Sequence, residues 1–352
     1  MTWTKMAPSP RRRAVSMAYY EDDVAKAIDA IGVDGTRSGL TAPISAGQKL
    51  QGLSLRDHEK YVSLTMEFRC NLKCIHCMIE DTMDRLQVTP METFHRICDD
   101  QRATNRWEGL VLTGSEVTLR RDLVDLAKTA KSAGFKHIRI QTHGMHLGRV
   151  DYADRLIEAG IDEFFVSVAG SDRESHDRIT QVSGAWDKMM QGLVHLDQYD
   201  HVKIITNSVV TTQSYMLLPN MVDALSHLKR LVQMEFWCYF PMAVQDTKDL
   251  AANNLDILPF LKQAILKCRA SNLFTEVKNF PECLLADLSD SLVNAQPTLF
   301  IDPDFWAEFD KNGFYNCPHQ ASCASKECLG LTTAYVKKFG NQTEILRPLV
   351  ID

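Results

Sequence analysis

Strand-like and helix-like segments alternate six times along the chain, and this order restricts the fold more than any other feature. Each short run rich in β-branched and aromatic residues precedes a run with helical spacing of apolar residues. The expected strands cover residues 61–66, 109–112, 137–142, 163–168, 202–210 and 234–240. The expected helices cover residues 90–100, 122–133, 152–159, 185–196, 217–228 and 255–270. Six such units favour an open, parallel α/β barrel with its site at the carboxyl ends of the strands.

Three closely spaced cysteines follow the first expected strand directly. Cys70, Cys74 and Cys77 form a CxxxCxxC pattern, and thiolates at this spacing are typical ligands of zinc or an iron–sulfur cluster. A structural zinc site needs four protein ligands, and His76 could supply the fourth. A [4Fe–4S] cluster held by three thiolates would instead leave one iron open to a cofactor. The cysteines alone leave both alternatives open.

Later segments carry a resemblance that favours the cluster. Residues 110–118, 138–144 and 164–170 each place small and polar residues at the end of an expected strand, and a His-Asp pair follows the third segment. Together with CxxxCxxC, they resemble the GGEP turn, the TNG strand end and the SLDG…HD segment of the radical SAM superfamily. In that superfamily the open iron binds S-adenosylmethionine (SAM), and reductive cleavage of SAM yields a 5′-deoxyadenosyl radical that abstracts a substrate hydrogen.

The resemblance implies a set of residues that bind SAM. Gly114, Ser115 and Glu116 stand in the turn expected to hold the methionine amine, although the superfamily usually has a second glycine in place of Ser115. The other expected contacts are Thr142, His143, Ser167 and Asn207. The resemblance also implies an electron donor of the flavodoxin or ferredoxin type.

Four further cysteines lie beyond the sixth expected strand. Cys317, Cys323 and Cys328 are close together, and Cys283 lies upstream. Four thiolates can saturate a second [4Fe–4S] cluster, and the segment looks like the SPASM or twitch auxiliary domains of many radical SAM enzymes. Zinc on four cysteines is the alternative, and His319 could replace Cys283 as a ligand. The expected cofactors are therefore two [4Fe–4S] clusters and SAM.

Cys238, on the last expected strand, is the candidate catalytic residue. Because side chains alternate along a strand, Phe236, Cys238 and Phe240 share one face, and Glu235 and Trp237 share the other. If the first face points into the barrel, the thiol could donate a hydrogen atom to a substrate radical. A small buried side chain that packs in the core is the alternative.

Composition and charge limit the partners. The 352 residues carry a formal net charge of −6, which gives no basic surface for nucleic acid. The chain has no apolar stretch long enough for a membrane span and no recognisable export signal, so we expect a cytoplasmic protein with reduced cysteines. The expected divisions are an N-terminal extension over residues 1–57, a barrel over 58–272 and an auxiliary-cluster domain over 273–352.

These features lead to three functional hypotheses. The first is a radical SAM peptide maturase that oxidises a C–H bond in a ribosomal peptide, with the auxiliary cluster accepting the substrate electron. The second is a dehydrogenase or epimerase that acts on a small natural product such as a sugar or aminocyclitol. The third is a non-enzymatic iron–sulfur electron-transfer protein, which would have no use for the turn at Gly114 and Glu116.

Overall fold

The structure, a computed structural model, describes residues 58–80 and 83–350. The N-terminal extension expected over residues 1–57 lies outside the described residues. Eight parallel strands form one sheet in the order β7-β6-β5-β4-β3-β2-β1-β8. The strands are β1 (Tyr61–Glu67), β2 (Gly109–Gly114), β3 (His137–Thr142), β4 (Glu163–Ser167), β5 (Lys203–Val210), β6 (Leu231–Cys238), β7 (Phe274–Lys278) and β8 (Thr298–Phe300).

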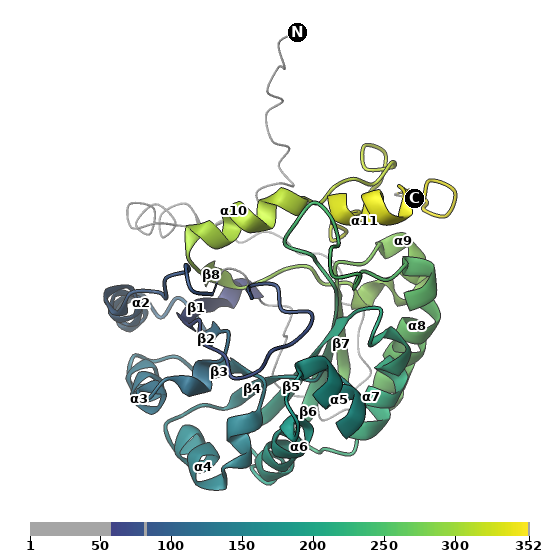
Figure 1. Ribbon diagram of the computed structural model, residues 1–352. Helices are drawn as coiled ribbons and strands as arrows, with labels where there is room; N and C mark the ends of the chain where they lie inside the picture. Colours follow the sequence, from purple (N-terminus) through teal and green to yellow (C-terminus); the bar gives the residue numbers. More distant parts are fainter. Residues whose placement is uncertain (1–57, 81–82, 351–352) are drawn as a thin grey trace, which may run out of the picture.

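Helices cover the outside of the curved sheet, as Figure 1 shows. The helices are α2 (Met91–Thr104), α3 (Leu123–Ser132), α4 (Val150–Glu158), α5 (Arg173–Thr180), α6 (Ala185–Leu196), α7 (Leu218–Leu225), α8 (Asn254–Ala270), α9 (Glu282–Leu285), α10 (Pro303–Asn312) and α11 (Thr333–Phe339). Short 3-10 turns are η2 (His58–Lys60), η3 (Val117–Leu119), η4 (Met145–Gly148), η5 (Tyr215–Leu217) and η6 (Ala286–Ser291). None of the described helices is long and apolar enough to cross a membrane.

All six expected strands are present within a few residues of their expected ends, which confirms the partial parallel α/β barrel. Two further strands come from beyond residue 272: β7 pairs with β6, and β8 pairs with β1 at the opposite edge. The barrel stays open because β7 and β8 lie at the two ends of the strand order. Helix α5 was not expected, since its sequence is mostly polar, but a capping box between Asp172 and Ser175 fixes its start.

The two faces of the sheet have different chemistry. On the outer face, Leu64 and Met66 of β1 belong to the main apolar core beneath the helices. The inner face carries polar groups, among them Glu163, whose carboxylate accepts hydrogen bonds from Arg139 Nε at 2.9 Å and Tyr61 Oη at 3.2 Å. These buried polar groups satisfy one another, which offsets part of the cost of removing their charges from water.

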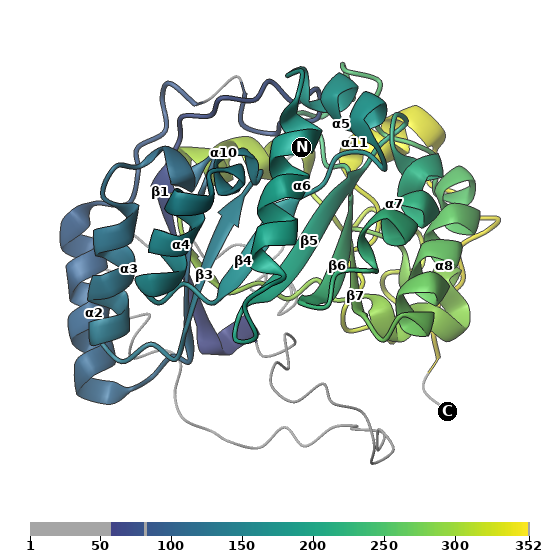
Figure 2. The same ribbon diagram turned by 90° about the horizontal axis from the view of Figure 1, so that it is seen from below.

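Helix α10 packs against both the segment that follows β1 and the segment that follows β6. Phe305 and Phe309 of α10 share an apolar cluster with Phe68, which follows β1. The ring of Phe309 also stacks on Phe240, which follows β6, with centroids 4.3 Å apart. Full burial of one such aromatic side chain stabilises the folded state by roughly 1.5–3 kcal/mol. Figure 2 shows α10 at the end of the sheet to which the strand arrows point.

Candidate cofactor and cluster sites

Cys70, Cys74 and Cys77 lie on the loop that follows β1, which we call the cysteine loop (residues 70–77). Backbone hydrogen bonds attach this loop to the end of α5: Lys73 N donates to the carbonyl of Thr180 at 3.1 Å. A second bond runs from Ile75 N to the carbonyl of Ile179 at 3.0 Å. The unexpected helix α5 therefore forms one wall of the loop.

The cysteines of the loop are half-buried, and their thiols are close enough to influence one another. Burial raises the pKa of Cys70 to about 11 and, together with the neighbouring Cys70 and Cys77, the pKa of Cys74 to about 12. A bound metal must therefore stabilise the thiolates. Within the described ranges, no three Cys, His, Asp or Glu side chains converge on one point as ligands of a single ion would. A cube-shaped cluster does not need such convergence, because each thiolate binds a different iron.

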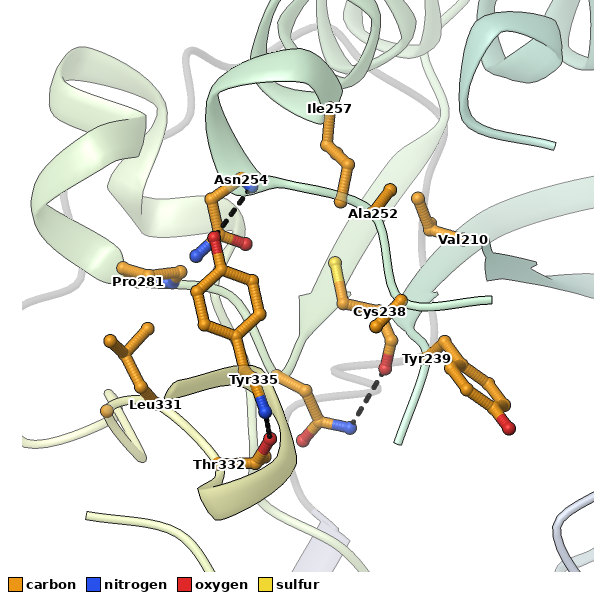
Figure 3. Close-up of a pocket in the computed structure, with 13 residues that line it drawn as sticks. Val210, Cys238, Tyr239, Ala252, Asn254, Ile257, Pro281, Leu331, Thr332 and Tyr335 are labelled. Atoms are coloured by element: carbon orange, nitrogen blue, oxygen red, sulfur yellow. Dashed lines mark hydrogen bonds between the residues drawn. The ribbon is translucent and has the colours of Figure 1, made fainter. Parts of the chain in front are cut away.

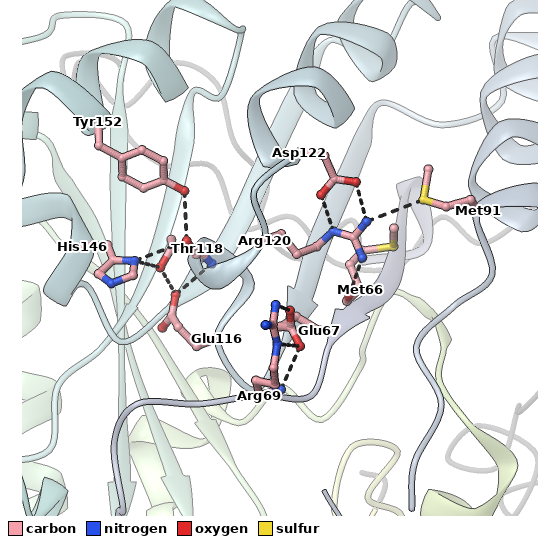
Figure 4. A network of polar contacts seen from close by, with 10 residues as sticks. All are labelled: Met66, Glu67, Arg69, Met91, Glu116, Thr118, Arg120, Asp122, His146 and Tyr152. Atoms are coloured by element: carbon pink, nitrogen blue, oxygen red, sulfur yellow. Dashed lines mark hydrogen bonds and ion pairs between the residues drawn. The ribbon is translucent and has the colours of Figure 1, made fainter. Parts of the chain in front are cut away.

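The turn after β2 lies directly against the end of β1. Gly114 has a φ of +145°, and a Cβ at this position would come within 1.9 Å of the Glu67 carbonyl oxygen, so only glycine fits. The same carbonyl accepts a hydrogen bond from Ser115 N at 2.8 Å. Arg120, which follows the turn, donates to the Met66 carbonyl at 2.8 Å and so also attaches the turn to β1 (Figure 4).

Glu116 is fully buried and is surrounded by donors. Its Oε1 accepts from Thr118 N at 3.0 Å and from the Thr118 hydroxyl (Figure 4). It also accepts from Thr142 Oγ1 at 2.7 Å. Its Oε2 accepts from His143 N at 2.8 Å and lies 3.0 Å from His143 Nε2. The carboxylate therefore joins the turn after β2 to the end of β3.

Several buried polar atoms at this end of the sheet have no hydrogen-bond partner among the described residues, among them Ser115 Oγ, His176 Nε2 and Asn207 Oδ1. His176 Nδ1 accepts from Ala169 N at 3.2 Å, so its unpartnered Nε2 carries the proton. Ser167, the β-sheet neighbour of Asn207, is exposed at the end of β4. An amino acid and a ribose offer donors and acceptors for such atoms, so these residues fit SAM.

The four C-terminal cysteines line one cavity, which we call the four-cysteine pocket (Cys283, Cys317, Cys323 and Cys328). Its empty volume is about 310 Å³, including the open mouth. Backbone amides point at two of the sulfurs: Leu349 N donates to Cys323 Sγ at 3.3 Å, and Gly330 N to Cys328 Sγ at 3.4 Å. Amide donors of this kind stabilise thiolates and cluster sulfurs.

The structure separates the two candidates for the fourth ligand of the pocket. Cys283, at the start of α9, lines the cavity, and its pKa is raised by burial and by the nearby Cys317 and Cys323. His319 is absent from the cavity wall, and its Nε2 is buried without a partner among the described residues. The geometry favours Cys283.

Cys238 lines a pocket together with Ile257 and Tyr335, as Figure 3 shows, and no residue of the cysteine loop lines it. Its side chain belongs to the outer core with Ile257 of α8, whereas Trp237 packs on the inner face near Phe165. Burial alone raises the pKa of Cys238 to about 12. The inward orientation on which a hydrogen-donor role depends is therefore not the one observed, and the geometry favours packing.

Two sets of contacts at the sites were missed in the sequence. Asn71 Oδ1, inside the cysteine loop, lies 2.7 Å from His143 Nε2. Lys248 Nζ lies 2.8 Å from Glu80 Oε2 and 3.5 Å from the carbonyl oxygen of Cys77. The only sequence signal for the first contact is His143 itself, which stands where the superfamily usually has the asparagine of the TNG strand end. The second joins residues 168 positions apart and has no local signal.

Comparisons with known proteins agree with this geometry. The sequence profile of the Radical SAM superfamily matches residues 66–232. The chain is 28% identical over 173 residues to a probable GTP 3′,8-cyclase of Methanopyrus kandleri, with 48% of this chain and 54% of that protein covered. It is 29% identical over 174 residues to the Fe-coproporphyrin III synthase of Methanosarcina barkeri, with 49% and 43% covered. The chain thus matches only about half the length of these curated relatives.

Among solved structures, SuiB of Streptococcus suis has a similar fold. The SAM-bound form gives a TM-score of 0.55 at 17% identity and covers 81% of this chain and 76% of SuiB. The form bound to its precursor peptide SuiA gives 0.51 at 17% identity, with 78% and 63% covered. At these identities the likeness concerns the fold alone. With the profile match over residues 66–232 and three cysteines after the end of β1, this part of the chain belongs to the radical SAM superfamily.

Proposed function

We propose that this chain is a radical SAM maturase that oxidises a ribosomal peptide with the help of two [4Fe–4S] clusters. The observation that carries the proposal is the presence of two separate cysteine sets in one fold. The cysteine loop follows the carboxyl end of β1, and Cys283 of the four-cysteine pocket follows shortly after the carboxyl end of β7. Because the strands are parallel, both sets belong to the same edge of the sheet.

The two sites would divide an oxidation between them. When bound at the cysteine loop, a cluster and SAM supply a 5′-deoxyadenosyl radical, which takes one hydrogen atom from a substrate carbon. Ser115, Asn207 and His176 would orient SAM through their unpartnered buried atoms. The electron left on the substrate would pass to the four-cysteine pocket and a proton would pass to solvent. The product would then be two hydrogens lighter than the substrate.

Support for a peptide substrate comes from the fold. The likeness to SuiB covers 81% of this chain, so it extends beyond the barrel into the C-terminal segment. SuiB binds a precursor peptide, and a chain of similar fold would serve the same class of substrate. An electron donor of the flavodoxin or ferredoxin type would reduce the first cluster.

A small natural product is the second candidate substrate. The curated relatives at 28–29% identity are named for small-molecule reactions, those of a GTP cyclase and a coproporphyrin synthase. A dehydrogenase or epimerase of a sugar or aminocyclitol would use the same barrel. A pure electron-transfer role leaves the unpartnered buried atoms beside Gly114 without a ligand to bind.

The test is an anaerobic reaction of the reconstituted protein with dithionite, SAM and short peptides encoded beside its gene. We expect 5′-deoxyadenosine to form in proportion to a peptide that has lost two hydrogens, as measured by mass spectrometry. GTP and sugar phosphates serve as parallel substrates. Turnover of one of these small molecules, with every peptide unchanged, would contradict the peptide substrate and favour a small-molecule substrate.

A further inference from the structure

The carboxylate of Glu116 is closed to a ligand by burial: Oε1 accepts three hydrogen bonds, and Oε2 accepts one and is covered by the His143 ring. A carboxylate has about four lone-pair sites in total. Two side chains and two backbone amides already donate to it from Thr118, Thr142 and His143, and the His143 ring lies 3.0 Å from Oε2. The side chain is 0% exposed. A direct bond from Glu116 to the ammonium of SAM would therefore require one of these contacts to break.

The ring of His143 points from Glu116 to the cysteine loop. Its Nδ1 accepts a hydrogen bond from Met145 N at 3.2 Å, so the proton of the neutral ring sits on Nε2. That Nε2 lies 2.7 Å from Asn71 Oδ1 and 3.0 Å from Glu116 Oε2. His143 is 7% exposed, so water competes little for these bonds.

We infer that His143 is a positioning residue that fixes the cysteine loop to the SAM-binding turn through Asn71, and that Glu116 acts only through His143 and Thr142. Asn71 directly follows Cys70, so a movement of its side chain displaces a cluster ligand. The link would set the distance between the open iron and the site of the methionine amine. This inference rests on membership of the superfamily and is independent of the proposed peptide substrate.

The variants that test the link are His143→Ala, Asn71→Ala and the double variant. His143→Gln is the conservative replacement, because the Gln side-chain amide can donate from nearly the position of the imidazole Nε2. His146→Ala is the matched control: His146 Nδ1 lies 3.2 Å from Thr118 Oγ1, beside the same carboxylate, and is not hydrogen-bonded to Asn71. Iron content and the melting temperature show whether each variant has folded and holds its clusters.

The readouts are the SAM dissociation constant and the change that SAM causes in the electron paramagnetic resonance spectrum of the reduced first cluster. We expect each alanine variant to keep its iron, lose most of the SAM-induced change and bind SAM about tenfold more weakly, the usual effect of one buried hydrogen bond. The double variant should be no worse than either single variant. His143→Gln and His146→Ala should behave like the wild type.

Two results would overturn the inference. One is a double variant in which the losses of SAM affinity measured for the two single variants multiply. The other is an unchanged SAM-induced spectrum in His143→Ala. Neither readout needs a substrate, so a failure of the peptide proposal leaves this test intact. Conversely, a wild-type protein that modifies peptides while His143→Ala responds normally to SAM would contradict only the positioning role.

Discussion

The two cysteine regions of this protein are built in opposite ways. The cysteine loop is held by the barrel: two backbone bonds attach it to α5, and Asn71 contacts His143 at the end of β3. The four-cysteine pocket is formed mainly by irregular chain between α9 and residue 349, with short helices on either side. A regular scaffold can position ligands before a metal arrives, whereas an irregular segment depends on the metal for its order.

This difference separates two roles for metal in one chain. At the cysteine loop, protein contacts should survive without a cluster, and the cluster adds reactivity. At the four-cysteine pocket, the cluster should also act as a structural cross-link. A salt bridge joins the C-terminal segment to the barrel, from Lys338 of α11 to Asp246 after β6, at 2.7 Å.

The largest expected effect follows from replacing Cys70, Cys74 and Cys77 together by alanine. Production of 5′-deoxyadenosine should fall to background, because no other thiolates hold an open iron beside Gly114. The melting temperature should change little, since the loop keeps its bonds to α5. Unfolding of the barrel in this variant, seen by circular dichroism, would show that the first region also depends on its metal.

The complementary variant replaces Cys317 and Cys323 by alanine. Substrate turnover should be lost, whereas uncoupled formation of 5′-deoxyadenosine should continue. Hydrogen exchange should accelerate over residues 313–350 far more than in the barrel, because the pocket loses its cross-link. A variant that stays folded but no longer cleaves SAM would break the division between the two regions.

Glu116→Gln tests whether the site on the barrel is ordered by protein contacts rather than by its ligands. The new NH2 group would face either the donors of Thr118 and Thr142 at the Oε1 position or the His143 amide at the Oε2 position, which leaves buried donors unpaired. We expect a loss of roughly 1–3 kcal/mol in the free energy of unfolding, together with weaker SAM binding. Thermal unfolding of the variant measures the first effect. Wild-type stability with weakened SAM binding would instead indicate direct contact between Glu116 and SAM.

The smallest effect is expected at Cys238. Cys238→Ala should lower the free energy of unfolding by roughly 1 kcal/mol and leave the product unchanged. The native thiol should also react slowly with alkylating reagents, because burial raises its pKa to about 12 and keeps it neutral. Turnover in deuterated water is the stricter test: one solvent deuterium in an isomeric product would establish a thiol donor and an epimerase.

The sequence predicts the barrel well because its strands are short, apolar and separated by amphipathic helices. It does not predict β8, since three half-buried residues carry too little pattern. It misses α5 because Ile179 is nearly its only apolar side chain, although the Asp172–Ser175 capping box is a readable start signal.

The candidate site is less predictable because its contacts join distant segments. Cysteine spacing identifies the four C-terminal cysteines that come to line one cavity. Glu116 accepts hydrogen bonds from Thr142 and His143, which are 26 and 27 positions away in the sequence. The spacing of apolar residues gives no indication of such contacts. Strand alternation correctly puts Cys238 and Trp237 on opposite faces. Which face is the inner one depends on the helices that pack outside.

The iron count of the anaerobically reconstituted protein tests the central claim most directly. With two differently built cluster sites, the wild type should bind about eight irons, and the Cys70, Cys74 and Cys77 triple variant about four. The four that remain should belong to a cluster without an open iron, so SAM should leave its spectrum unchanged. Stoichiometric zinc in place of iron at either site, or loss of all iron in the triple variant, would contradict the account.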